Sequence, residues 1–145
     1  MLYRIANTLD SRVGYRGGQF EWFGKPSARF DDLINIIPAR VTALMLCIAA
    51  YIINIDKHCA MNGLTTAWRD SSQCASPNAG WPMGAMAGVL LVRLEKKGEY
   101  CLGKCLDSAR DPTPNDIRVG HKIAQVAGLL ALFTSIVIII VVCGL

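Results

Sequence analysis

The sequence predicts an all-α integral membrane protein, in which two to three membrane-embedded helices are joined by polar connecting segments. Three observations support this fold class. Apolar residues make up 52% of the 145 residues and charged residues only 18%, whereas average soluble domains carry roughly 25% charged residues. The apolar residues also gather in runs instead of spreading along the chain. The longest run, residues 123–145, contains no charged side chain.

Three segments are candidates for membrane-embedded helices, at residues 36–55, 79–92 and 123–145. A helix over residues 123–145 would be about 35 Å long at ~1.5 Å per residue, which exceeds a hydrocarbon core of ~30 Å. Arg118 and Lys122 precede this segment, so the positive-inside rule places its N-terminal end in the cytoplasm. We therefore expect a multi-pass protein of the cell (cytoplasmic) membrane, in contact with membrane lipid.

The other two segments are less regular. Segment 36–55 contains one charged residue, Arg40, which either snorkels to the membrane surface or faces a polar site. Segment 79–92 is short for a span and suits a buried or re-entrant helix better. It holds Gly80, Gly84 and Gly88, a spacing that lets helices approach closely, and we favour helix packing as the reason for these glycines.

Charge and composition exclude two classes of protein. A chain this apolar and this poor in charge is not a disordered tail. The net charge is +4, but the chain lacks the basic stripe with interleaved aromatic residues that is typical of nucleic-acid-binding surfaces. No nucleic acid partner is therefore expected.

A first polar cluster lies just before and within the first apolar segment. On a helix, Asp31 and Asp32 share a face with Asn35, because residues three and four apart are neighbours. Two carboxylates and an amide oxygen suit Mg²⁺, which takes one or two carboxylates together with substrate phosphates. Arg29 and Arg40 flank the cluster and could bracket a phosphate. The alternative is that Asp31 and Asp32 only cap a helix N-terminus.

A second polar cluster occupies residues 76–82, with the sequence SPNAGWP. Asn78 is a good helix N-cap and Pro82 is tolerated in a first helical turn. A loop that opens a helix beside small residues presents free N–H groups, which suits phosphate or carboxylate binding by Ser76, Asn78 and Gly80. The alternative is an ordinary turn and cap, and spacing alone favours it.

Four stretches of the chain form a recognisable combination. They are NTLDSRVGY at 7–15, SARFDD through PAR at 27–40, SPNAGWP with MAG at 76–88, and GEY with PNDI at 98–117. Together these stretches resemble the CobD/CbiB family, the membrane-associated adenosylcobinamide-phosphate synthases of cobalamin biosynthesis. The resemblance runs through most of residues 3–120.

The resemblance implies an amide-forming ligase. Its reaction joins a propionate carboxylate of a corrinoid, adenosylcobyric acid, to the amine of an amino alcohol, aminopropanol or its phosphate. ATP and Mg²⁺ are the implied cofactors, with Mg²⁺ held by Asp31, Asp32 and Asn35. Asp10 is the best remaining candidate for the base that deprotonates the amine. The residues expected to bind substrate or phosphate are Arg29, Asn35, Arg40, Ser76, Asn78 and Gly80.

The resemblance also bears on domain organisation. Residues 1–145 are interpreted as one domain that corresponds to the C-terminal half of the family domain. We expect the chain to be inactive alone and to need a missing N-terminal half, or a homo-oligomer that supplies equivalent helices. Two other functions stay open. One is a membrane phospho- or prenyltransferase with a Mg²⁺-diphosphate site, and the other is a non-catalytic or truncated membrane subunit.

Overall fold

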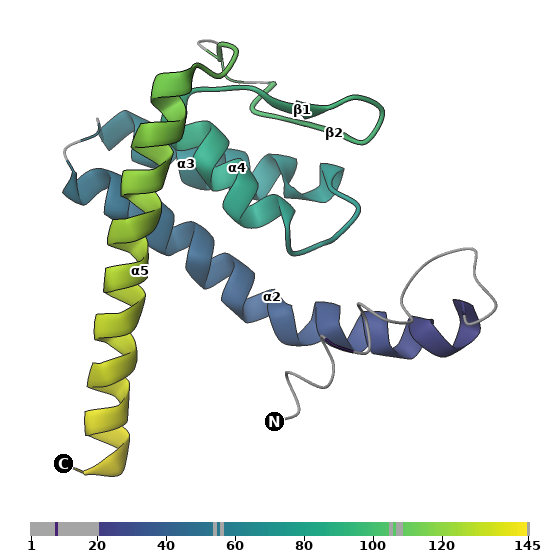
Figure 1. The fold of residues 1–145 in the computed structure, drawn as a ribbon, viewed down its shortest axis with the longest axis vertical. Coiled ribbons are helices and arrows are strands. Elements are labelled where there is room, and N and C mark those ends of the chain that lie inside the picture. Colours follow the sequence, from purple (N-terminus) through teal and green to yellow (C-terminus); the bar gives the residue numbers. More distant parts are fainter. Residues whose placement is uncertain are drawn as a thin grey trace.

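The computed structural model describes residues 8, 21–53, 55, 57–104, 106 and 109–144. The described part is mostly helical, as predicted, and its last helix runs steeply across the others (Figure 1). A short two-stranded hairpin corrects the expectation of a purely helical chain. The elements are α2 (Glu21–Ile52), α3 (Lys57–Asp70), the 3-10 turn η1 (Ser71–Gln73), α4 (Gly80–Leu90), β1 (Leu94–Lys96), β2 (Tyr100–Leu102) and α5 (Pro114–Cys143).

Two of the described helices are long and apolar enough to cross a membrane, over Ala28–Ile52 and Pro114–Cys143. The first corresponds to the predicted segment 36–55, but its helix begins earlier, at Glu21, and ends at Ile52. Helix α2 continues through Pro38 although proline has no N–H to donate. The Pro38 carbonyl accepts a hydrogen bond from the Thr42 hydroxyl at 2.8 Å.

Helix α4 packs against both α3 and α2 and corresponds to the predicted segment 79–92 (Figure 1). Its 11 residues are too few for a span. Gly84 and Gly88 face α3, where a Cβ on Gly84 would lie 2.9 Å from the Cα of Ala67, and Gly80 faces Ser71 at the start of η1. The prediction that these glycines serve close helix packing is confirmed, because side chains at these positions would push α4 away from α3 and η1.

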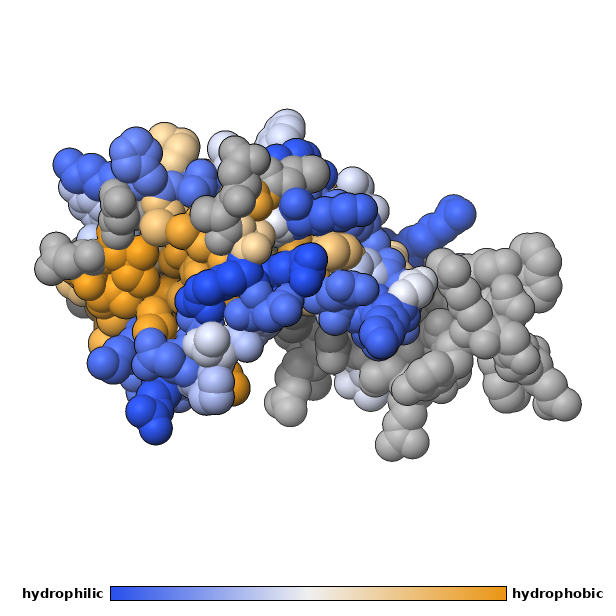
Figure 2. Space-filling view, turned by 90° about the horizontal axis from the view of Figure 1, so that it is seen from above, coloured by the Kyte–Doolittle hydropathy of each residue, from blue (hydrophilic) through white to orange (hydrophobic). Residues whose placement is uncertain are grey.

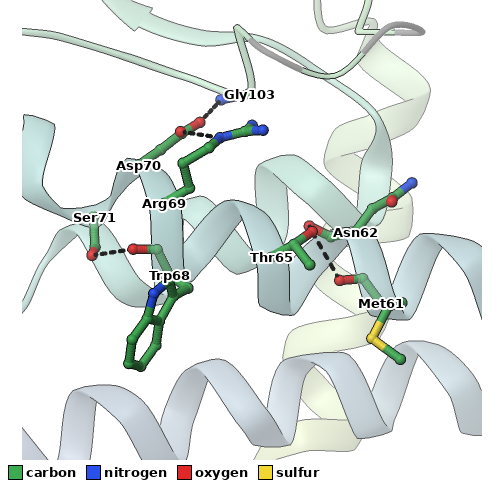
Figure 3. A network of polar contacts seen from close by, with 8 residues as sticks. All are labelled: Met61, Asn62, Thr65, Trp68, Arg69, Asp70, Ser71 and Gly103. Atoms are coloured by element: carbon green, nitrogen blue, oxygen red, sulfur yellow. Dashed lines mark hydrogen bonds and ion pairs between the residues drawn. The ribbon is translucent and has the colours of Figure 1, made fainter.

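The hairpin follows α4 and is tied to the end of α3. Strands β1 and β2 are antiparallel, with Leu94 opposite Leu102. The fully buried carboxylate of Asp70 accepts the Gly103 N–H at 2.8 Å and the Arg69 Nε–H at 2.9 Å (Figure 3). Gly103 has a φ of +80°, which favours glycine. The strands were not predicted because three residues each give too short an alternation to recognise.

Helix α5 begins nine residues before the predicted segment 123–145, at Pro114. Its start is fixed by a capping box, in which Asp116 accepts from the Thr113 N–H and hydroxyl. The Arg110 guanidinium donates both its Nη groups to this carboxylate at 2.6 Å, and the pairing raises the pKa of Arg110. The C-terminal half of α5 extends away from the other elements and leaves its apolar side chains exposed (Figure 1).

The core lies where α2, α3, α4 and α5 meet. Most of its residues are small, so the helices approach closely there. Its buried members include Ala43, Leu46, Ala49, Ala50, Ala67, Ala85, Val89, Ile123 and Ala127.

Candidate functional site

The first predicted polar cluster lies inside α2. Because the helix begins at Glu21, Asp31 and Asp32 sit well beyond its first turn, where they cannot cap the N-terminus. The interpretation that these carboxylates only cap a helix is therefore wrong. Both side chains are partly buried, so they occupy a polar position within a largely apolar helix.

Asn35 is directly bonded to Asp31, as its spacing predicts. Its Nδ2 donates to Asp31 Oδ2 at 2.9 Å and to the Asp31 main-chain carbonyl at 2.9 Å. The NH₂ side of the Asn35 amide thus faces the carboxylate. Asn35 therefore holds Asp31 in place, whereas a metal ligand would have to present its amide oxygen.

The second predicted cluster meets the first one through Asn78. The Asn78 side chain is 7% exposed, and its Nδ2 donates to the main-chain carbonyl of Asp32 at 2.7 Å and to Asp32 Oδ1 at 3.4 Å. These residues are 46 positions apart in sequence. The expectation that Asn78 caps α4 is wrong, because the cap position is Ala79. Ser76 Oγ instead accepts the N–H groups of Asn78 and Ala79 at 3.3 and 3.5 Å.

A second contact joins the same two elements about two helical turns further along α2. The Arg40 guanidinium carbon lies 4.5 Å from the ring centroid of Trp81, a cation–π distance. Trp81 in turn meets Trp68 edge to face, with centroids 5.7 Å apart. Arg40 also donates to the Ile36 carbonyl at 2.7 Å, so its charged group reaches back toward the aspartates. Figure 3 shows the Trp68 indole on the side of α3 opposite the Asp70 carboxylate.

Two acceptor oxygens in this region have no hydrogen-bond partner among the described residues. They are Asp31 Oδ1 and Asn78 Oδ1, and both are enclosed. Leaving a buried acceptor unpaired costs about 1–3 kcal/mol. The other oxygen of the Asp31 carboxylate accepts from Asn35 within α2, and the Nδ2 of the Asn78 amide donates to Asp32 of α2. The junction of α2 and α4 thus carries unused acceptor capacity of the kind that a cation or an N–H donor satisfies.

Residues 1–124 match the family described as CobD/Cbib protein. The chain belongs to the CobD/CbiB family. It is 41% identical over 139 residues to a cobalamin biosynthesis protein CobD of Dehalococcoides mccartyi. The aligned region covers 96% of this chain and 43% of that relative. It is 38% identical over 147 residues to a protein of the same name from Rhodobacter capsulatus, and this alignment covers 92% of this chain and 45% of that relative.

A third relative, the cobalamin biosynthesis protein CobD of Photorhabdus laumondii, is 46% identical over 94 residues, which are 65% of this chain and 28% of that protein. This chain thus spans less than half the length of the CobD relatives it matches. No solved structure matches it.

The remaining predicted site residues of this CobD/CbiB chain are placed less centrally. Arg29 is exposed on α2. Gly80 faces the main chain of Ser71, with which a Cβ would collide, so packing accounts for its small size. Asp10, the predicted base, lies outside the described residues, as does the whole stretch 9–15 of the family resemblance. Within the described chain, no three His, Cys, Asp or Glu side chains gather as a metal site.

Sequence reasoning missed two contacts, one at this junction and one at the end of α3. The pairing of Trp81 with Arg40 was not predicted, although Trp81 packs against the core and its ring holds the Arg40 guanidinium. The signal was the arginine itself, because a cation inside an apolar helix requires a partner. Asp70 carried no sequence signal, since its partner, Gly103, is contributed by a distant turn.

Proposed function

We propose that this chain acts in cobalamin biosynthesis as part of an amide-forming ligase of the adenosylcobinamide-phosphate synthase type. In this reaction a propionate carboxylate of adenosylcobyric acid is joined to the amine of aminopropanol or its phosphate. Membership of the CobD/CbiB family supports the pathway. The observation that carries the proposal is the Asn78–Asp32 bond, because it joins the two polar stretches of the family resemblance into one place.

The charged groups of the junction suit different parts of the two substrates. Asp31 and Asp32 supply negative charge and acceptor oxygens, and they suit the ammonium or amine of the amino alcohol. The Arg40 cation suits an anionic group, either the phosphate of the amino alcohol or the corrinoid carboxylate. Asn35 and Asn78 fix the two aspartates by N–H donation. Arg29 is proposed to steady phosphate at the exposed edge.

ATP and Mg²⁺ are proposed as cofactors. Oxygen atoms at the junction of α2 and α4 suit the binding of Mg²⁺. Asp31 Oδ1 and Asn78 Oδ1 are both unpaired among the described residues, and both are oxygen ligands of the type Mg²⁺ prefers. Asn35 fits this role less well, since its NH₂ group faces Asp31. ATP supplies the driving force, since amide formation releases one water and ATP cleavage takes up one water.

We also propose that α2 and α5 cross the cell membrane. Their length and apolar composition support this placement. The end of α2 and the start of α5 then lie on the same side of the membrane. Helices α3 and α4 run alongside α2, so that Asn78 reaches Asp32 near the other end of the span.

The test is an assay of the purified chain, alone and together with the part of the Dehalococcoides mccartyi relative that it does not match. Adenosylcobyric acid, aminopropanol phosphate, ATP and Mg²⁺ are supplied, and the corrinoid product is identified by mass. We expect an amide product from the combined parts and little from the chain alone. Absence of product from the combined parts, with turnover of an isoprenoid diphosphate under the same conditions, would show that a transferase reaction is the correct one.

A further inference from the structure

An apolar groove lies between the last turns of α2 and the first turns of α3, away from the junction of α2 and α4. Its volume is about 300 Å³. The side chains that line it are apolar except at one end, where a lysine meets a tyrosine. The main lining residues are Leu44, Ile48, Tyr51, Lys57, Met61 and Leu64.

The walls of the groove are exposed to a degree unusual for large apolar side chains. Met61 is 62% exposed, Tyr51 51% and Leu44 44%. Ile48 and Leu64, which also line the groove, are exposed as well. Figure 2 shows a broad apolar patch at the left of the view from above. Contiguous apolar surface of this kind marks a place that something covers.

The charged end of the groove identifies the kind of molecule that covers it. Lys57 Nζ lies 5.7 Å from the ring centroid of Tyr51. Tyr51 belongs to the candidate span that ends at Ile52, and Lys57 is the first residue of α3, just beyond that end. The groove thus runs from apolar side chains within the span to an ammonium group at its boundary, over about 10 Å of α2 between Leu44 and Tyr51.

We propose that this groove binds an anionic phospholipid, with an acyl chain between α2 and α3 and the phosphate beside Lys57. The proposal rests on the proposed membrane placement of α2. Tyrosine and lysine at a membrane boundary are typical of contact with headgroups. An apolar helix in the same groove would offer the Lys57 ammonium no opposite charge, and burying an ammonium without one is costly. A lipid phosphate satisfies the charge and the apolar walls together.

The experiment measures lipid binding to the purified full chain in detergent. The probes are phosphatidylglycerol and phosphatidylcholine with identical acyl chains, and retained lipid is counted by native mass spectrometry. One lysine near the headgroups favours an anionic lipid by about fivefold. We expect that preference in the unaltered chain, and we expect it to fall as ionic strength rises.

Two variants separate the headgroup from the acyl chain. Lys57→Gln should remove the preference and leave phosphatidylcholine binding unchanged, whereas Ile48→Trp should fill the groove and reduce retention of both lipids. The matched controls are Lys97→Gln, in the exposed turn between β1 and β2, and Val141→Trp, on the exposed surface of α5. Both controls should bind as the unaltered chain does.

Three results would overturn the inference. They are equal binding of the two lipids, a preference that survives Lys57→Gln, and an Ile48→Trp variant that changes the oligomeric state of the chain without changing lipid retention. The membrane placement is tested separately by carbonate washing of membranes that contain the unaltered chain. Release of the chain by carbonate contradicts the placement itself, and firm retention without a lipid preference contradicts only the groove.

Discussion

Asn78 decides how the two polar clusters relate to each other. Local preference would place its side chain over the start of α4, but the amide instead reaches α2 and bonds Asp32. Ser76 supplies the local acceptor that the turn needs. The buried Asn78 side chain thus makes a long-range contact with α2, while Ser76 accepts the hydrogen bonds within the turn. The same Asn78 contact that positions the loop against α2 also brings the two polar clusters together.

The first prediction concerns this amide. Asn78→Asp removes the donor and brings a carboxylate against the Asp32 carbonyl and carboxylate. We expect a loss of about 1–3 kcal/mol in the free energy of unfolding, as for other unpaired buried polar groups, and a larger loss than for Asn78→Ala. The measurement is denaturant unfolding in detergent. Asn115→Asp, at the exposed first turn of α5, is the control and should not destabilise, since negative charge is favourable there.

The second prediction separates chemistry from folding at Asp32. The shorter bond from Asn78 goes to the main-chain carbonyl of Asp32, so Asp32→Ala keeps that bond. We expect near-normal stability but a fall in amide-forming turnover of about 100-fold or more, the usual scale for losing a charged group at a reacting centre. Asp111→Ala, an exposed loop carboxylate, should keep full activity. Unchanged turnover of Asp32→Ala in the complemented assay would remove Asp32 from the proposed site.

Sequence reasoning at this scale reached the contacts that depend on helical spacing and missed those that depend on tertiary packing. The bond from Asn35 to Asp31 follows from a separation of four residues. The pairing of Arg40 with Trp81 does not, because it requires knowing that α4 lies along α2. Asp10 stays a prediction, since it lies outside the described residues.

At the level of elements, the close contact of α4 with α3 depends on small residues. The Gly88 position faces the main chain of Asn62, and the Gly84 position faces Ala67. This packing sets the position of the loop before α4 and therefore of Asn78. The glycine spacing allowed the packing to be predicted, whereas the partner helix α3 was not predicted, because it is polar on average and lies outside the apolar segments of the sequence.

The third prediction uses the same substitution at two helical glycines. Gly88→Ala should destabilise the chain, because its Cβ would collide with the Asn62 carbonyl, a main-chain atom that cannot move alone. Gly128→Ala should instead stabilise it by about 0.5–1 kcal/mol, because alanine is the better helix former and nothing lies within 4 Å of the new Cβ. Unfolding midpoints of the two variants give the comparison. A stabilising Gly88→Ala would contradict the close contact of α3 and α4.

On the scale of the whole molecule, α5 is packed at one end and exposed at the other. Ile123 and Ala127 are buried against the other helices, whereas Leu132, Phe133 and Val141 are exposed. Composition was enough to predict an apolar span here, because twenty or so uncharged residues suffice for that. The steep crossing of α2 and α5 (Figure 1) was not predictable, since it depends on which small residues meet at the core.

The last prediction tests whether the exposed half of α5 faces lipid. Phe133 lies near the middle of the uncharged run and is 67% exposed, so Phe133→Arg places a charge at the membrane centre without disturbing the core. An arginine there costs about 2.5–3.5 kcal/mol on insertion scales. We expect a clear fall in the carbonate-resistant fraction of the chain. Gln125→Arg adds the same charge near the start of the run, where the side chain reaches the membrane surface, and should insert normally. Equal insertion of the two variants would mean that α5 is covered by protein instead of lipid, because only a lipid environment makes the cost of the charge depend on its depth.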